Sequence, residues 1–399
     1  MDGRSGRDRS GGALGLALGL ALGLGCAGSG PSGASAPGAE SSAGEGSTGS
    51  SAGDGSSGSS GSSGAGMDLG GSGTTLLRGA TIAGGGQADV RIAGAMITAV
   101  GPLEPLPGEA VVELGGSFLA PGFIDSHVHL VFLPGAKAMA RGGVVAAVDL
   151  AAPLAAFDGD FSPLRVVLAG PMVTAVMGYP TQGWGAGGYG IECADASAAV
   201  AAVDLLHERG AGVIKVPVTG APTLDDATLT AVVERAHEHG LKVASHALGD
   251  AEARRAGEAG ADVLAHTPTS PMSATTRGLW SKRAVISTLG AFGGGAAAVQ
   301  NLADLRAEGA RILYGTDYGN STAAGIDGAE IALLSAAGLS PAEILAAGTS
   351  EPAAFWGLDG LGAIAPGKEA SLLVLAEDPL VAPEALAEPS RVMVRGEWH

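Results

Sequence analysis

The sequence predicts an α/β fold, namely a (β/α)₈ (TIM) barrel that carries a small β-sandwich domain. Short apolar strands alternate with helical segments over residues 121–360, and β-like segments flank this region at residues 75–120 and 361–399. Strand and helix units that repeat over roughly 240 residues match the usual size of such a barrel. A doubly wound parallel sheet is the alternative that the same alternation permits.

The first 26 residues are typical of an export signal. An apolar run at residues 13–24 follows a basic segment that holds Arg4, Arg7 and Arg9, and it is shorter than a membrane-spanning helix. Cys26 follows this run as in the lipobox of bacterial lipoproteins, although Gly23 replaces the usual apolar residue. We therefore expect a lipid on Cys26 that holds the exported protein at the periplasmic or cell-surface face of a bacterial membrane. Secretion is the alternative.

Residues 27–74 consist mainly of Gly, Ser and Ala, with a few acidic residues and no basic one. Such a segment cannot bury enough apolar surface to fold. We expect a disordered tether, which as a flexible coil would have an r.m.s. length of roughly 35–40 Å.

The predicted β domain takes its strands from both ends of the globular part. Apolar runs between glycines predict strands over residues 76–79, 88–92, 96–100 and 110–114, and again over 371–375 and 391–395. We therefore expect residues 75–120 and 361–399 to form one domain beside the barrel.

The barrel strands are predicted from short apolar runs at residues 123–130, 144–150, 165–168, 213–218, 242–246, 262–266, 284–289 and 311–315. Helical segments closed by glycine separate most of them, for example residues 196–209, 225–239, 251–259 and 302–308. In this fold the active site lies at the carboxyl ends of the strands.

Charge and cysteine content exclude several classes of function. The net charge of −18 leaves no basic face for nucleic acid, so we expect no nucleic-acid partner. Cys26 and Cys193 are the two cysteines, too few for a disulfide framework or a zinc finger.

His127 and His129 form an HxH motif at the end of the first barrel strand. Side chains two residues apart on a strand point to the same side, so both imidazoles can bind one metal ion. His237 and His239 form a second HxH motif, but in a helical segment, where residues two apart do not face each other. We interpret that second pair as surface residues.

Four more residues that can bind metal stand at predicted strand ends: Lys215, His246, His266 and Asp317. One such residue could equally be a cap or a loop hydrogen-bond partner. Because the strand ends of a barrel converge on one face, the coincidence of several favours a single metal centre.

This order of HxH, Lys, His, His and Asp resembles the amidohydrolase superfamily, in its binuclear form with a carboxylated lysine, from Thr75 to His399. Two flanking segments strengthen the resemblance: residues 119–125 (LAPGFID) and residues 367–375 (GKEASLLVL).

The resemblance implies two divalent metal ions, zinc by default, with manganese, cobalt or iron as alternatives. His127, His129 and Asp317 would hold the first ion, His246 and His266 the second, and Lys215, carboxylated by CO₂, would bridge both. A hydroxide activated by the two metals would attack an amide, a cyclic amide or a related C–N or ester bond of a small-molecule substrate. Asp317 would move the proton to the leaving group.

Within the superfamily, the sequence around these residues most resembles the prolidase-like and imidazolonepropionase-like branches. Those relatives tend to have His-Ala-His-Gly after strand 5 and Glu-His-Gly after strand 6, whereas here the residues are HALG at 246–249 and AHT at 265–267. Specificity for dipeptides is therefore not implied.

Residues 177–190 follow the third barrel strand and concentrate aromatic residues in a chain that has 4% of them. One interpretation is a lid that brings Tyr179, Trp184 or Tyr189 to the substrate. The other is a glycine-rich surface loop with its aromatic residues packed on the barrel.

Two further classes of function stand beside the hydrolase. One is a catalytically silent metal-binding lipoprotein that uses the barrel as a ligand-binding module. The other is a structural or adhesive surface protein, for which the tether is the sole argument.

Overall fold

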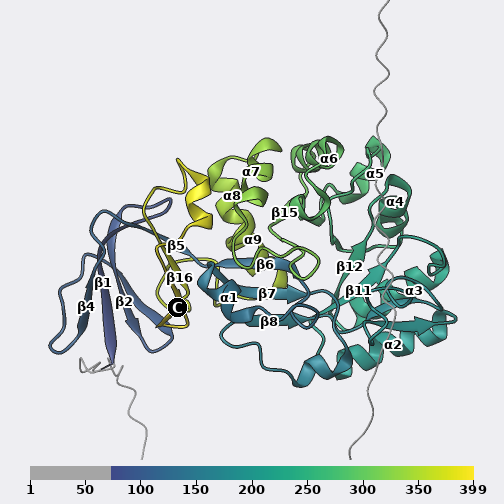
Figure 1. The fold of residues 1–399 in the computed structure, drawn as a ribbon, viewed down its shortest axis with the longest axis horizontal. Coiled ribbons are helices and arrows are strands. Elements are labelled where there is room, and N and C mark those ends of the chain that lie inside the picture. The colour runs from purple at the N-terminus through teal and green to yellow at the C-terminus, as the bar shows by residue number, and fades with distance from the viewer. Residues whose placement is uncertain (1–72) are drawn as a thin grey trace, which may run out of the picture. The chain divides into compact units, whose positions relative to one another are not determined.

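The computed structural model describes residues 73–399 (Figure 1). The expected export signal, the lipid on Cys26 and the tether lie outside these residues. Within them, no helix combines the length and the apolar character needed to cross a bilayer.

All the predicted barrel strands are present, and each is parallel to its neighbours. One sheet has the order β6 (Phe123–Val128), β7 (Val144–Asp149) and β8 (Arg165–Leu168). A second sheet has the order β11 (Val213–Pro217), β12 (Lys242–His246), β13 (Val263–Leu264), β14 (Ala284–Ile286) and β15 (Arg311–Leu313).

Backbone hydrogen bonds join the two sheets at both edges. The N–H of Ser126 in β6 donates to the carbonyl of Tyr314, just after β15, over 2.9 Å. At the other edge the N–H of Gly212 donates to the carbonyl of Leu168 in β8 over 3.0 Å. The strands therefore follow one another in a ring. This arrangement confirms the α/β barrel and contradicts the doubly wound alternative, whose sheet has open edges.

Helices lie around the strands in Figure 1. They are α1 (Ala136–Arg141), α2 (Ala196–Glu208), α3 (Asp226–Glu238), α4 (Asp250–Glu258), α5 (Ala274–Trp280), α6 (Ala296–Ala307), α7 (Gly328–Ala336), α8 (Pro341–Gly348) and α9 (Ser350–Trp356). Several begin at the side-chain caps that their sequences offer: Asp195 accepts from the N–H of Ala198, and Asp225 from that of Thr228.

The inside of the ring is filled by small and branched side chains. Val213, Ala244, Val263 and Ala284 are buried in one cluster that also includes Phe355 of α9. The barrel is thus a packed core, and polar chemistry is confined to the ends of the strands.

Strands from both ends of the globular part share one sheet beside the barrel, where β16 lies next to β5 (Figure 1). Its members are β1 (Thr74–Ile82), β2 (Gln87–Ala93), β3 (Met96–Gly101), β4 (Ala110–Glu113), β5 (Phe118–Pro121), β16 (Leu372–Leu375), β17 (Arg391–Val394) and β18 (Glu397–Trp398). A core of its own contains Leu77, Ile92 and Met393. At the junction with the barrel, Arg165 at the start of β8 donates to the buried carboxylate of Glu369 over 2.7 Å.

The sequence did not predict one parallel pair, β9 (Met172–Ala175) and β10 (Gly190–Cys193). Both strands are short, and β10 carries one buried residue, Cys193. The pair encloses most of residues 177–190, called the lid segment below, and holds the two ends of that segment together.

Candidate metal centre

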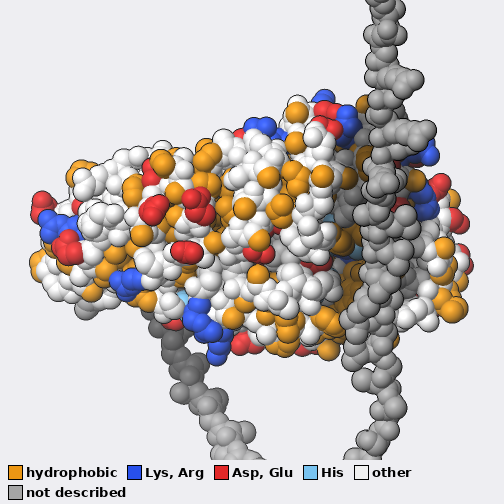
Figure 2. Space-filling model, turned by 45° about the horizontal axis from the view of Figure 1, so that its top comes forward, with side chains coloured by type: hydrophobic (Ala, Val, Ile, Leu, Met, Phe, Trp, Pro, Cys, Tyr) orange, Lys and Arg blue, Asp and Glu red, His pale blue; other side chains and the backbone are white. Residues whose placement is uncertain are grey.

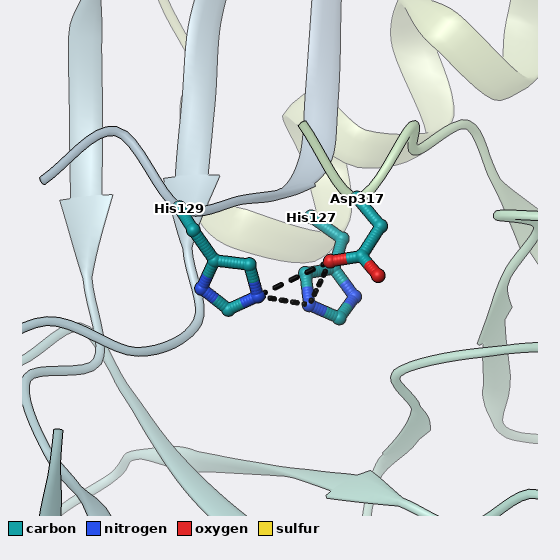
Figure 3. Close-up of side chains that lie close together, drawn as sticks. All are labelled: His127, His129 and Asp317. Carbon is teal, nitrogen blue, oxygen red and sulfur yellow. Dashed lines mark hydrogen bonds and ion pairs between the residues drawn. The ribbon is translucent and has the colours of Figure 1, made fainter. Parts of the chain in front are cut away.

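The HxH motif ends β6 with both imidazoles turned to one point. Nδ1 of His127 lies 2.8 Å from the carbonyl oxygen of Ala265, and Nδ1 of His129 lies 3.4 Å from that of Ala151. Because a carbonyl only accepts, each Nδ1 carries the proton, and each Nε2 is left with a lone pair. The two Nε2 atoms are 3.3 Å apart (Figure 3).

Asp317 follows β15, the strand that lies next to β6 in the ring, and completes this group. Its Oδ1 atom is 3.4 Å from Nε2 of His127 and 3.1 Å from Nε2 of His129 (Figure 3). The residue has a φ of 54°, a strained conformation for a side chain other than glycine. Asn320 donates to the same oxygen over 3.1 Å, which helps to fix the carboxylate.

His246 and His266 form a second group at the ends of β12 and β13. Nε2 of His266 is 3.0 Å from Nδ1 of His246, and Nδ1 of His266 is 3.0 Å from the hydroxyl of Thr288. The rings of His266 and His127 are 4.4 Å apart between centroids, so the two groups are neighbours. The structure thus brings together all the histidines that the sequence predicted at the site.

Lys215 is fully buried in β11, and its Nζ atom has no hydrogen-bond partner among the described residues. Burial lowers the pKa of this amine to about 7. Burial is the main cause that lowers the pKa values of His127, His246 and His266, and the charge of Lys215 lowers all three further, so Lys215 lies close to both groups of ligands. A buried lysine without any partner is costly, which indicates that a further group belongs beside it.

The protonation states suit a cation. Burial is the main cause that lowers the pKa of His246 to about 3, and it also lowers that of His127 well below its usual value. Burial alone would raise the pKa of Asp317, but the imidazoles of His127 and His129 lower it below the usual value. Neutral imidazoles and an ionised carboxylate are the forms that bind metal ions.

Sequence reasoning missed two buried carboxylates that position these ligands. Asp125 accepts from the backbone N–H groups of His127 (3.0 Å) and Thr316 (3.1 Å), and so ties β6 to the turn before Asp317. Asp149 accepts from the N–H groups of Leu130 (2.8 Å) and Ala151 (3.1 Å).

Burial raises the pKa of Asp125 to about 7 and that of Asp149 to about 6. Asp149 is the last residue of the apolar strand β7, and Asp125 is a charged residue inside the fully buried strand β6; these positions are the signal that could have identified them.

The lid segment covers the metal ligands with aromatic rings. The ring centroid of Tyr179 lies 5.0 Å from that of His246, and the centroid of Trp184 lies 5.2 Å from that of His129. The indole N–H of Trp184 donates to the hydroxyl of Tyr179 over 2.8 Å. Tyr189 packs on Trp184 at 5.3 Å and does not contact the ligands through any described ring pair.

The second HxH motif is not part of this centre. His237 lies 2.9 Å from Asp262, whereas His239 lies 2.7 Å from Asp204 on a different helix. The two imidazoles therefore turn to different partners.

His127, His129 and Asp317 are the group of three described residues whose ligand atoms lie close enough to hold one ion. His246 and His266 add two nitrogen ligands beside it. The buried Nζ atom of Lys215 has no hydrogen-bond partner among the described residues, so a further group can bind there. The donor set therefore fits two divalent cations with nitrogen and oxygen ligands.

The chain is similar to several known proteins. The sequence model described as "Amidohydrolase family" matches residues 118–399. The adenine deaminase of Deinococcus radiodurans is 28% identical over 310 residues, which cover 73% of this chain and 55% of that protein. The allantoinase of Rubrobacter xylanophilus is 32% identical over 240 residues, which cover 55% of this chain and 48% of that protein. The chain therefore spans about half the length of these relatives.

Among solved structures, a Xaa-Pro dipeptidase with methionine in its active site is similar in fold. It has a TM-score of 0.71 and 21% identity, and the match covers 82% of this chain and 99% of that one.

Proposed function

Given that this chain belongs to the amidohydrolase family, we propose that it is a metal-dependent hydrolase that cleaves an amide, a cyclic amide or a related C–N or ester bond. One observation carries the proposal: Nε2 of His127, Nε2 of His129 and Oδ1 of Asp317 meet within 3.4 Å, beside the paired imidazoles of His246 and His266. The family generally binds divalent metal ions, and this donor set suits them.

In the proposed site, His127, His129 and Asp317 hold one ion, and His246 and His266 hold the other. Zinc is the expected metal, because imidazole and carboxylate ligands suit it, and manganese, cobalt or iron are the alternatives. Two such ions would polarise the scissile carbonyl and make a shared water more acidic.

Lys215 supplies the bridging anion in this proposal. Its buried, partnerless amine is the nucleophile that reacts with CO₂: the nitrogen bonds to the carbon, and one proton is released. The resulting carbamate offers two oxygens, whereas an ammonium group would repel both cations. The lowered pKa of Lys215 is consistent with this chemistry.

The chain's own side chains then manage the proton. Asp317 accepts it from the attacking water and donates it to the leaving nitrogen or oxygen. Asn320 and the turn tied to Asp125 keep that carboxylate in place. Tyr179 and Trp184 cover the metal ligands and exclude water from the site, and Tyr189 packs against Trp184.

Metal content and hydrolysis test the proposal, and the chain supplies its own control. The protein should contain about two metal ions per chain and hydrolyse members of a panel of anilides, N-acyl amines, hydantoins and lactones. A chelator should abolish hydrolysis, and added metal should restore it.

His127→Asn should remove metal and activity, whereas His237→Asn in the second HxH motif should change neither. Bound metal without hydrolysis across the panel would favour the silent binding module and contradict the hydrolase.

We also propose that Cys26 carries a lipid that holds the protein at a bacterial membrane. Cys26→Ser should release an active enzyme from the membrane fraction, because the described residues offer no helix long enough to anchor it. Unchanged retention in the membrane fraction would contradict the lipid anchor.

A further inference from the structure

Within the described part of the chain, the segments that leave the carboxyl ends of the barrel strands are poor in basic residues. The segments that follow the barrel strands, of which the third includes β9 and β10, contain no lysine or arginine: residues 129–135, 150–164, 169–195, 218–225, 247–249, 265–273, 287–295 and 314–327. The one lysine at this end of a strand is Lys215, which belongs to the metal centre. No cation is therefore left in these segments to recognise an anionic part of a substrate.

The arginines that reach these segments from α4 and α5 are already paired. Arg255 of α4 binds Asp226 over 2.7 Å, and Arg277 of α5 binds Glu308 over 2.7 Å. Lys137 of α1 is the exception, since it is exposed and makes no ion pair with any described residue; its charge adds to the lowering of the pKa of Asp160, which is mainly due to the hydrogen bond with Ser162. Figure 2 draws one face of the molecule, on which Lys and Arg side chains form separate groups and no continuous patch is visible.

Apolar side chains surround the same face. Of the large apolar side chains that are exposed, four stand in these segments: Phe132 (42%), Val176 (47%), Met177 (60%) and Phe292 (36%). Phe132 packs edge-on against Trp184 at 5.3 Å, and Phe292 packs edge-on against His266 at 4.9 Å. An exposed apolar rim around a buried polar centre is the usual form of a binding surface for apolar ligands.

We propose that the substrate is an uncharged or cationic amide with an aromatic or apolar group beside the scissile bond, and that carboxylate-bearing substrates are rejected. The inference rests on the proposed function, since the metal centre defines where the scissile bond lies. An aromatic group would stack on Tyr179, Trp184 and Phe132. A cation would be tolerated because ring faces attract positive charge.

The rejection of anions follows from desolvation. A carboxylate on the part of the substrate that lies under the aromatic rings, away from the two proposed metal ions, loses its hydration and meets rings instead of a guanidinium. A buried charge that lacks its partner typically costs at least ~2 kcal/mol, which corresponds to a preference of about 30-fold.

Matched anilides measure this preference directly. Acetanilide, 4-acetamidobenzoate and 4-(aminomethyl)acetanilide share one scissile bond and one ring but carry charges of 0, −1 and +1. The kcat/KM for acetanilide should exceed that for 4-acetamidobenzoate by at least about 30-fold, and the cationic analogue should resemble acetanilide. Equal kcat/KM values for the neutral and anionic compounds would overturn the inference.

Binding of the amine products gives a second readout that does not need turnover. Aniline should quench tryptophan fluorescence at a concentration at least about 30-fold lower than 4-aminobenzoate does, and Trp184→Phe should remove the signal. Tighter binding of 4-aminobenzoate would contradict the inference, whatever the enzyme hydrolyses. Absence of hydrolysis across all panels would contradict the proposed function and leave this binding test decisive.

A cation introduced at the rim should weaken the preference for the neutral substrate. Phe132→Arg places a guanidinium beside Trp184. The ratio of kcat/KM for acetanilide to that for 4-acetamidobenzoate should narrow by about fivefold, the effect of one partly exposed charge pair. Phe132→Leu keeps the rim apolar and should leave the ratio unchanged. The same ratio in both variants would show that charge at the rim does not set specificity.

Discussion

The two ends of the barrel strands differ in what their charged residues do. At the amino ends, basic residues open or directly precede several strands, namely Arg165, Lys242, Arg283 and Arg311. Three of them serve structure: Arg165 binds Glu369, Arg311 binds Glu351 over 2.8 Å, and Arg283 donates to two backbone carbonyls.

At the carboxyl ends, histidines and acids converge, and Lys215 is left without a partner. Satisfied charges at one end and an unsatisfied one at the other indicate that stability and chemistry are separated along the same strands.

The amino end also has the larger apparent opening. A pocket of about 510 Å³ lies there between Arg283, Arg306 and Phe355, whereas the metal ligands at the other end are nearly inaccessible beneath the lid segment. A pocket of about 580 Å³ lies elsewhere, in the β domain beside Ile92 and Arg395, so pocket size does not identify the active site. The partnerless lysine and the converging ligands identify the correct end of the strands.

The strongest test of this comparison is a pair of substitutions at opposite ends of the strands. Asp317→Asn should lower kcat by about 10²–10⁴-fold, because it removes the proton carrier and an anionic metal ligand. Glu351→Gln at the amino end should change kcat by no more than about 2-fold, as expected for a surface residue. Comparable losses of kcat in the two variants would contradict the separation.

Removing the aromatic cover should have the next largest effect. Trp184→Ala should lower kcat/KM for a neutral anilide by up to about 100-fold, because Trp184 positions the substrate and supports Tyr179. Metal content and thermal stability should stay the same. An unchanged kcat/KM would favour the alternative interpretation, in which these residues form a surface loop without a role in catalysis.

At the amino end the expected effect is on stability. Arg165→Gln leaves the buried carboxylate of Glu369 without its main partner and should lower the free energy of unfolding by about 2 kcal/mol. The control is Arg254→Gln in the exposed pair with Glu258, which should cost less than about 0.5 kcal/mol. Both variants should keep their activity at low temperature. A loss of kcat in Arg165→Gln would show that residues at the amino ends of the strands also affect catalysis.

The smallest effect concerns Glu330, a buried acid of α7 that accepts from the N–H groups of Leu289 (3.0 Å) and Gly290 (2.7 Å). Burial raises its pKa to about 7 from an ordinary 4.5, so the folded state holds the proton more tightly than the unfolded state. The stability contributed by that proton is present at low pH and is lost as the pH rises through about 7.

Denaturant unfolding between pH 6 and pH 8 should therefore show a loss on the order of 1 kcal/mol that Glu330→Gln removes. Identical pH slopes in the wild type and the variant would show that Glu330 is not the responsible group.

Much of this structure could be predicted from the sequence, because local patterns encode it. The barrel strands follow from apolar runs, and the helix starts follow from caps such as Asp195 and Asp225. The six candidate ligands could be identified because each stands at a strand end, and strand ends converge in a barrel.

What remained hidden depends on contacts between distant residues. The ring closure between Ser126 and Tyr314 and the β9 and β10 pair are hydrogen bonds across long sequence separations. The role of Asp125 cannot be predicted locally, because it depends on a hydrogen bond from the N–H of Thr316, 191 residues away. The absence of cations from the strand ends was visible in the sequence, but it had meaning only once those segments were known to surround one centre.

Lys215 tests the central claim most directly. Lys215→Ala should bind fewer metal ions and lose most of its activity, and acetate or propionate should restore part of both by supplying the missing oxygens. Lys215→Arg keeps the charge but forms no carbamate, so it should be inactive and should not respond to acetate. Bound metal and hydrolysis would be measured for the wild type, for Lys215→Ala with and without acetate, and for Lys215→Arg. Full activity in the arginine variant, with two metal ions still bound, would contradict the account.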